Sequence, residues 1–262
     1  MNHAGPEWMA SVRRFDDGSK VHINIGQVKA MAIFTVTGDI DPFLHVSLNK
    51  GERIYCESDA MVMMEDTLDL TGKMTGGLGS ALMRRFANGE SFFQQHIEAT
   101  RGDGDCLLSP VLPGTIQVLE VGATCYMLSD GAFVAAESGV DLRVRAQSLG
   151  NALLAQTGGF FVGEATGKGK LAVSGFGSGF ILDVAPGKDV IIDNAHVVAW
   201  DSQLRYELSV PNQQGGGLFN RLVSSVTSGE GVVLRFSGRG KVVICSRNRN
   251  AFSSWVRGGA RG

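Results

Sequence analysis

The sequence predicts an all-β protein built from three internal repeats, and three observations support this. Glycine supplies 36 of the 262 residues and proline only 6, a balance typical of tight turns between short strands. In short stretches such as 181–184, the residues of one strand face are apolar (Leu182 and Val184) and the other face carries a charge (Asp183), as in a half-buried strand. A related motif also recurs, as SDAMVMM at 58–64, SDGAFVA at 129–135 and DNAHVVA at 193–199.

The first half of each predicted repeat is strand, turn, strand, turn, strand. The first turn contains glycine, at Gly51, at Gly122 or at Pro186-Gly187. The second turn is a polar pair followed by a small residue. Asp and Asn bond their own backbone and tolerate positive φ, so these pairs are read as turn residues. The pairs are Ser58-Asp59, Ser129-Asp130 and Asp193-Asn194.

The second half of each repeat is predicted to hold a short helical turn, an apolar strand, a Gly-x-Gly turn and a last strand. The helical turns are centred on Leu82, Leu153 and Leu222. The Gly-x-Gly turns are Gly102/Gly104, Gly167/Gly169 and Gly238/Gly240. We therefore expect repeats at about 44–110, 116–175 and 180–246, in one β-domain over 12–255 with tails at 1–11 and 256–262. Packing the three repeats together would complete a barrel-like sandwich with a shared core.

The composition limits the kinds of binding partner and the cellular compartment that we expect. The formal net charge is −2, so no nucleic-acid partner is expected. Four cysteines without a CxxC pair suit reduced thiols, and the N-terminus lacks the apolar core of a signal peptide, so a cytoplasmic location is expected. No apolar run approaches the roughly 20 residues of a transmembrane helix. The arginine-rich C-terminus is interpreted as a solvated tail.

Two segments carry a family resemblance, GGLFNRLVSSVTSGEGVVLRFSGRGKVVICSRN at 216–248 and PGKDVIIDNAHVVAWD at 186–201. With the three turn motifs, they resemble the family named after altered inheritance of mitochondria protein twenty-four, over residues 12–255. The resemblance implies a short double-stranded β-helix similar to the tryptophan RNA-binding attenuator proteins. Bacterial members of the family are conserved proteins of unknown function, and no catalytic residues come with the resemblance. The attenuators' RNA-binding positions are not matched here.

Candidate chemistry in the sequence is sparse. The Gly-Lys pairs at 72–73, 167–168 and 187–188 lack the Ser or Thr that a phosphate-binding loop requires. No two histidines stand at i and i+2, although His96 and Glu98 share a strand face and are the nearest approach to a metal site. His196 is read as a structural imidazole. The sequence therefore predicts no catalytic residue, no metal and no cofactor.

Three functions remain open at this stage. The first is a non-enzymatic, self-associating β scaffold, with a trimer favoured, that presents a surface to a protein partner or a membrane-associated assembly. The second is a small-ligand binding module with pockets between repeats. The third is a cupin-like metal enzyme at His96 and Glu98. For the second function, the predicted ligand-binding residues are the turn residues Ser58, Asp59, Ser129, Asp130, Asp193 and Asn194.

Overall fold

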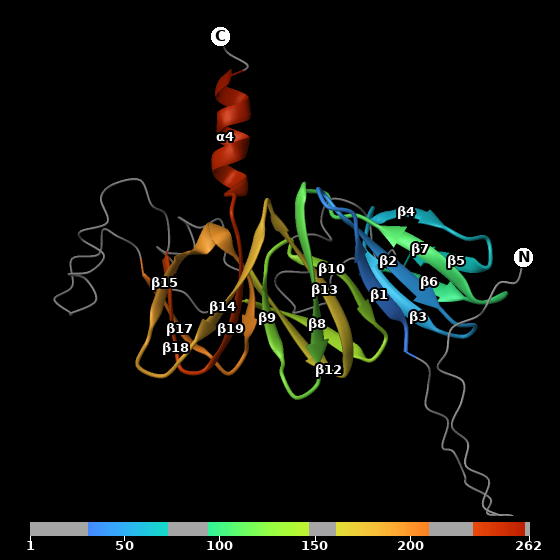
Figure 1. Cartoon of the computed structure of the whole chain (residues 1–262), viewed down its shortest axis with the longest axis horizontal. Helices are drawn as coiled ribbons and strands as arrows, with labels where there is room; N and C mark the ends of the chain where they lie inside the picture. Colours follow the sequence, from blue (N-terminus) through green and yellow to red (C-terminus); the bar gives the residue numbers. More distant parts are fainter. Residues whose placement is uncertain (1–30, 73–93, 147–160, 210–232, 260–262) are drawn as a thin grey trace, which may run out of the picture.

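The computed structural model describes residues 31–72, 94–146, 161–209 and 233–259, and these residues are almost all in antiparallel strands (Figure 1). The predicted all-β class is therefore confirmed. The helical turns expected around Leu82, Leu153 and Leu222 lie outside the described residues. None of the helices in the described ranges is long and apolar enough to cross a membrane.

The strands form four sheets, named here in chain order. Sheet 1 is, in spatial order, β1 (Ile33–Thr37), β2 (Phe43–Leu48), β7 (Gly104–Leu108) and β4 (Met61–Met64). Sheet 2 is β5 (Leu68–Gly72), β6 (Gln94–Ala99), β3 (Arg53–Glu57), β10 (Phe133–Glu137), β13 (Gly169–Phe176) and β8 (Gly114–Val121).

Sheet 3 has the same number of strands as sheet 2, and sheet 4 is smaller. Sheet 3 is β11 (Val140–Ala146), β12 (Phe161–Gly167), β9 (Tyr126–Ser129), β16 (Val197–Asp201), β19 (Gly240–Cys245) and β14 (Gly179–Val184). Sheet 4 is β15 (Val190–Asp193), β18 (Val233–Ser237) and β17 (Arg205–Ser209). All pairings between these strands are antiparallel. The sheets lie side by side along the long axis of the molecule (Figure 1).

The core is divided into three clusters of buried apolar side chains. The first includes Leu44 of sheet 1 and Ile97 of sheet 2, and the second includes Leu171 of sheet 2 and Leu128 of sheet 3. The third centres on Trp200, which lies edge-on to Phe236 with ring centroids 5.7 Å apart. Each cluster therefore joins two neighbouring sheets face to face, as expected of a sandwich.

Three of the predicted Gly-x-Gly turns carry the chain from one sheet to the next. They connect β6 to β7, β12 to β13 and β18 to β19. A Cβ on Gly169 would lie 2.6 Å from Glu137 Oε2, and a Cβ on Gly240 would lie 2.9 Å from Asp201 Cβ. Glycine is therefore required at these corners for close packing.

Two strands, β3 and β9, continue their sheets across what would be a repeat boundary. In sheet 2, β3 pairs with β10 with Cys56 opposite Ala135. In sheet 3, β9 pairs with β16 with Leu128 opposite Ala199. These two pairings join the β-structure of the described chain into one continuous array.

A helix that the sequence did not predict follows the last strand. Helix α4 (Arg249–Gly259) stands out from the sheets (Figure 1). The expected domain end at residue 255 falls inside this helix, so the predicted tail at 256–262 is helical as far as residue 259. The helix begins where the Asn248 side-chain oxygen accepts a hydrogen bond from the Ala251 N–H, at 3.0 Å, the usual role of an N-cap residue.

Candidate functional site

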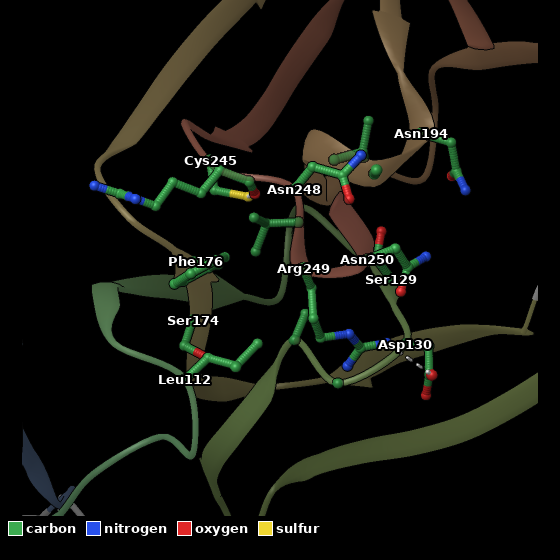
Figure 2. Close-up of a pocket in the computed structure, with 17 residues that line it drawn as sticks. Leu112, Ser129, Asp130, Ser174, Phe176, Asn194, Cys245, Asn248, Arg249 and Asn250 are labelled. Carbon is green, nitrogen blue, oxygen red and sulfur yellow. Dashed lines mark hydrogen bonds and ion pairs between the residues drawn. The ribbon is translucent and has the colours of Figure 1, made fainter. Parts of the chain in front are cut away.

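A polar recess of about 190 Å³ lies where sheets 2 and 3 meet. Its walls come from six places in the chain (Figure 2). They are Leu112 before β8, the β9–β10 turn, the end of β13, the 3-10 turn η1 (Asn194–His196) with the start of β16, the end of β19, and the residues around the start of α4. Segments that are more than a hundred residues apart in the sequence therefore converge here.

Three of the six predicted ligand-binding residues line this recess. Ser129 and Asp130 come from the β9–β10 turn, and Asn194 comes from η1 (Figure 2). Asp193 instead holds the turn, because its Oδ1 accepts a hydrogen bond from the Ala195 N–H at 2.9 Å. Ser58 and Asp59 lie in the β3–β4 turn and are not among the residues that line the recess.

Two side-chain oxygens that belong to residues lining the recess are buried without a hydrogen-bond partner among the described residues. They are Ser129 Oγ and Asn194 Oδ1. Most buried polar atoms in proteins are hydrogen-bonded, so such atoms require an explanation. A serine hydroxyl can donate and accept, whereas an amide oxygen only accepts. A partner for the Asn194 oxygen would therefore have to be a hydrogen-bond donor, whereas the Ser129 hydroxyl could take a donor or an acceptor.

Arg249 brings positive charge to the same recess. Its Nη2 lies 3.8 Å from Asp130 Oδ2, and Figure 2 shows its side chain reaching toward Asp130 beneath Asn248 and Asn250. The start of α4 is held in place by Phe252, whose ring packs edge-on against Phe176 at 5.1 Å. Reading the C-terminus as a solvated tail missed these residues. Asn248 three residues before Ala251, at the start of an amphipathic stretch, was the available helix-start signal.

Asp130 also faces the preceding turn, where Glu57 lies. Burial, and then repulsion from Asp130 and Asp59, raise the pKa of Glu57 to about 7, although Arg249 works against the shift. The two neighbouring turns therefore differ in chemistry. The first turn brings together Glu57 and Asp59, whereas the second pairs the carboxylate of Asp130 with Arg249.

When the β3–β4 and β9–β10 turns are aligned by backbone conformation, the alignment is shifted by one residue from the one given by their similar sequences. Asp59 and Gly131 are the residues with left-handed conformations, at φ 68° and 73°. The Ala60 N–H bonds to the carbonyl of Glu57, as the Ala132 N–H does to that of Ser129. Structurally, Glu57 therefore takes the place of Ser129, and the sequence alignment of Ser58 with Ser129 was wrong.

The predicted metal candidates lie elsewhere. His96 and Glu98 occupy alternate positions of β6, and the His96 ring centroid is 6.2 Å from that of Tyr55. No group of three or more His, Cys, Asp or Glu suited to a metal ion occurs within the described ranges. His196 bonds through Nδ1 to the Cys245 carbonyl oxygen at 2.8 Å, a contact that fits its predicted structural role.

The fold and the recess together define a class: an all-β protein of packed antiparallel sheets with a polar recess at a sheet junction. The family model described as Mitochondrial biogenesis AIM24 matches residues 34–247. The chain belongs to this family, as its sequence motifs predicted.

Two similar proteins are known from Streptococcus pyogenes. An uncharacterized protein of serotype M6 is 35% identical over 224 residues, covering 82% of this chain and 86% of that protein. A crystal structure of an S. pyogenes protein matches with a TM-score of 0.70 and 32% identity, covering 86% of this chain and 98% of that one.

Proposed function

We propose that the protein is a non-enzymatic, self-associating β scaffold made of three repeats. The pairing orders support the repeats. The order β2-β7-β4 has counterparts in β8-β13-β10 and β14-β19-β16, and the order β5-β6-β3 has counterparts in β11-β12-β9 and β17-β18-β15. The second strand residues of β4, β10 and β16 also sit at the same β-bulge, at Val62, Val134 and Val198. Each repeat would be a short double-stranded β-helix like that of the attenuator proteins.

The main support for self-association is the exposed apolar surface of the single chain. Large apolar side chains that stay exposed occur along edge strands and on α4, and contiguous patches of this kind commonly mark interaction sites. A second copy would cover some of these strands, and α4 would remain available for a protein partner or a membrane-associated assembly. The exposed residues include Ile33, Val36, Val62, Met63, Phe180, Ile181, Ile191, Phe252, Trp255 and Val256.

Native mass spectrometry of the purified protein, without added metal or ligand, tests this proposal. We expect a multiple of 27.8 kDa, and we propose a trimer. A protein that stays at the monomer mass across the accessible concentration range would contradict the scaffold function.

The recess favours a second candidate, a small-ligand binding module. Its support is the pair of buried oxygens, Ser129 Oγ and Asn194 Oδ1, which lack partners among the described residues and belong to residues that line a cavity. A retained non-protein mass in the native spectrum is expected, and Ser129→Ala with Asn194→Ala should abolish it. Ser58→Ala changes a serine outside the recess and should leave that mass in place. Equal retention in all variants would contradict this candidate.

A cytoplasmic location is part of the proposal. The cysteines Cys56, Cys106 and Cys245 are buried free thiols, and Cys125 is partly exposed and also free. Burial raises the pKa of Cys56 and of Cys106 to about 12, so these thiols stay protonated and unreactive. Free thiols are typical of reducing compartments. Fractionation of the source cells, followed by immunodetection, tests this location.

A further inference from the structure

Strands β4 and β15 are two of the eight strands that lie at the ends of the described sheets, where one side has no partner strand among the described residues. Strand β4 ends sheet 1 and pairs with β7, and strand β15 ends sheet 4 and pairs with β18. Figure 1 places β15 near one end of the molecule and β4 near the other. An unpaired edge offers a row of backbone donors and acceptors to another strand.

The counterparts of these two edges pair with each other inside the chain. Strands β10 and β16 correspond to β4, and strands β3 and β9 correspond to β15. Inside the chain, β3 pairs with β10 and β9 pairs with β16, in equivalent antiparallel registers. The third pairing of the same kind would join β15 to β4.

The exposure of side chains on β4 also indicates that this strand lacks the neighbour that β10 and β16 have. At the bulge, Val134 is 0% exposed and Val198 is 3% exposed, whereas Val62 is 54% exposed. The next position is fully buried as Ala135 and Ala199 but 42% exposed as Met63. Strand β4 therefore carries apolar residues at the positions that are buried in β10 and β16, although no described strand covers them in β4.

The other edge shows the matching contrast. Tyr55 and Met127, each the third residue from the end of its strand (β3 and β9), are 5% and 8% exposed. Their counterpart Ile191 in β15 is 46% exposed. Natural edges are commonly protected by charged side chains or proline, as β11 and β17 are by their arginines and acidic residues. Strand β4 has no charged residue, and β15 has one, at its last position.

We propose that β15 of one copy adds to β4 of a second copy, head to tail, and so continues the array between chains. This inference rests on the proposed self-association and specifies its interface. The internal pairings give the register: Met63 opposite Ile192, Met64 opposite Ile191 and Glu65 opposite Val190, in antiparallel strands. Because the two contacting surfaces differ, the contact is heterologous, and such contacts close into rings when the rotation permits.

Lysine substitutions at each edge test the contact. We expect Met63→Lys and Ile191→Lys each to shift the native mass from the oligomer to the 27.8 kDa monomer, since each places a charge in the buried strand contact. Both positions are exposed in the single chain, so the fold should tolerate the change, and unchanged thermal unfolding of the monomer confirms it. Phe180→Lys is the matched control, because Phe180 is also an exposed apolar residue on an edge strand, β14.

A disulfide experiment tests the register directly. Copies carrying Met63→Cys are mixed with copies carrying Ile192→Cys and oxidised, because facing antiparallel residues have Cα separations that a disulfide can span. We expect a covalent dimer from the mixture and none beyond background from either variant alone. A dimer from Met63→Cys alone would overturn the head-to-tail pairing.

The outcomes separate the two proposals. A wild-type protein that remains monomeric contradicts both self-association and this interface. An oligomer that persists in both lysine variants, or that Phe180→Lys dissociates instead, overturns the β15–β4 contact and leaves the scaffold proposal standing.

Discussion

Strands β4 and β10 show how one local structure can lead to two different environments. Each follows a turn with a left-handed residue, and each carries a bulge at its second residue. Strand β10 lies between β3 and β13 and is buried along its whole length, whereas β4 has β7 on one side and is partly exposed. The local sequence therefore sets the backbone, and the neighbouring strands set the burial.

The largest expected difference in stability is between variants of β4 and of β16, which like β10 has a strand on both sides. Trp200 is fully buried and packs against the rings of Phe236 and Tyr206. Trp200→Ala should lower the free energy of unfolding by about 3–5 kcal/mol, because it leaves a large cavity. Met64 holds the matching place in β4 and is partly exposed, so Met64→Ala should cost about 1 kcal/mol. Urea unfolding of both variants, at a concentration where the protein is monomeric, measures the difference, and equal losses would contradict it.

A smaller effect is expected at the end of β10. Glu137 is a buried carboxylate whose Oε2 accepts a hydrogen bond from the Lys170 N–H at 2.8 Å. Glu137→Ala should cost about 2 kcal/mol, since a partly buried N–H loses its acceptor. The exposed counterpart Glu65 makes the same bond to the Asp105 N–H at 3.1 Å, and Glu65→Ala should cost about 0.5 kcal/mol.

Glu137→Gln is the control for this pair of variants, because an amide oxygen keeps an acceptor in place. Chemical denaturation should find it closer to the wild type than Glu137→Ala. If the amide variant is as unstable as the alanine variant, the hydrogen bond is not what the carboxylate supplies.

The turn before β4 should also make stability depend on pH. The pKa of Glu57 is raised from 4.5 to about 7 in the folded protein, so the folded state holds this proton more tightly than the unfolded state. The free energy of unfolding should therefore fall by about 1–2 kcal/mol, after allowance for solvent screening, as pH rises from about 4.5 to about 7. Above pH 7 it should stay level. Glu57→Gln should remove this slope in urea titrations at pH 5 and pH 8. Ser129, the counterpart of Glu57, does not titrate, and a slope that survives in the Gln variant would assign it to another group.

The smallest expected effect is at the left-handed residue of each turn. Asp59 adopts φ 68°, which costs a side chain more than it costs glycine. Asp59→Gly should therefore stabilise the protein by about 0.5 kcal/mol, and Gly131→Ala should destabilise it by about 1 kcal/mol. Differential scanning calorimetry would record opposite shifts in Tm. Shifts in the same direction would mean that the two turns are not equivalent.

Much of the candidate site was visible in the sequence, but its assembly was not. The polar pairs Ser129-Asp130 and Asp193-Asn194 were predicted as turn residues, and the structure brings Ser129, Asp130 and Asn194 to one recess. Arg249 was read as part of a solvated tail, because a sequence does not show where a terminal helix docks. Alignment by residue type also paired Ser58 with Ser129 incorrectly, because it does not take backbone conformation into account.

The sequence by itself determined the strand-rich class, the glycine corners and the family. These depend on local rules: the period of two along a strand, the positive φ that glycine accepts at little cost, and the short polar side chains that close turns. The tertiary structure alone decided that Val134 is enclosed while Val62 is exposed, and that Asn194, Ser129 and Arg249 share one recess. Burial depends on which strands lie next to each other, and no short stretch of sequence records its neighbours.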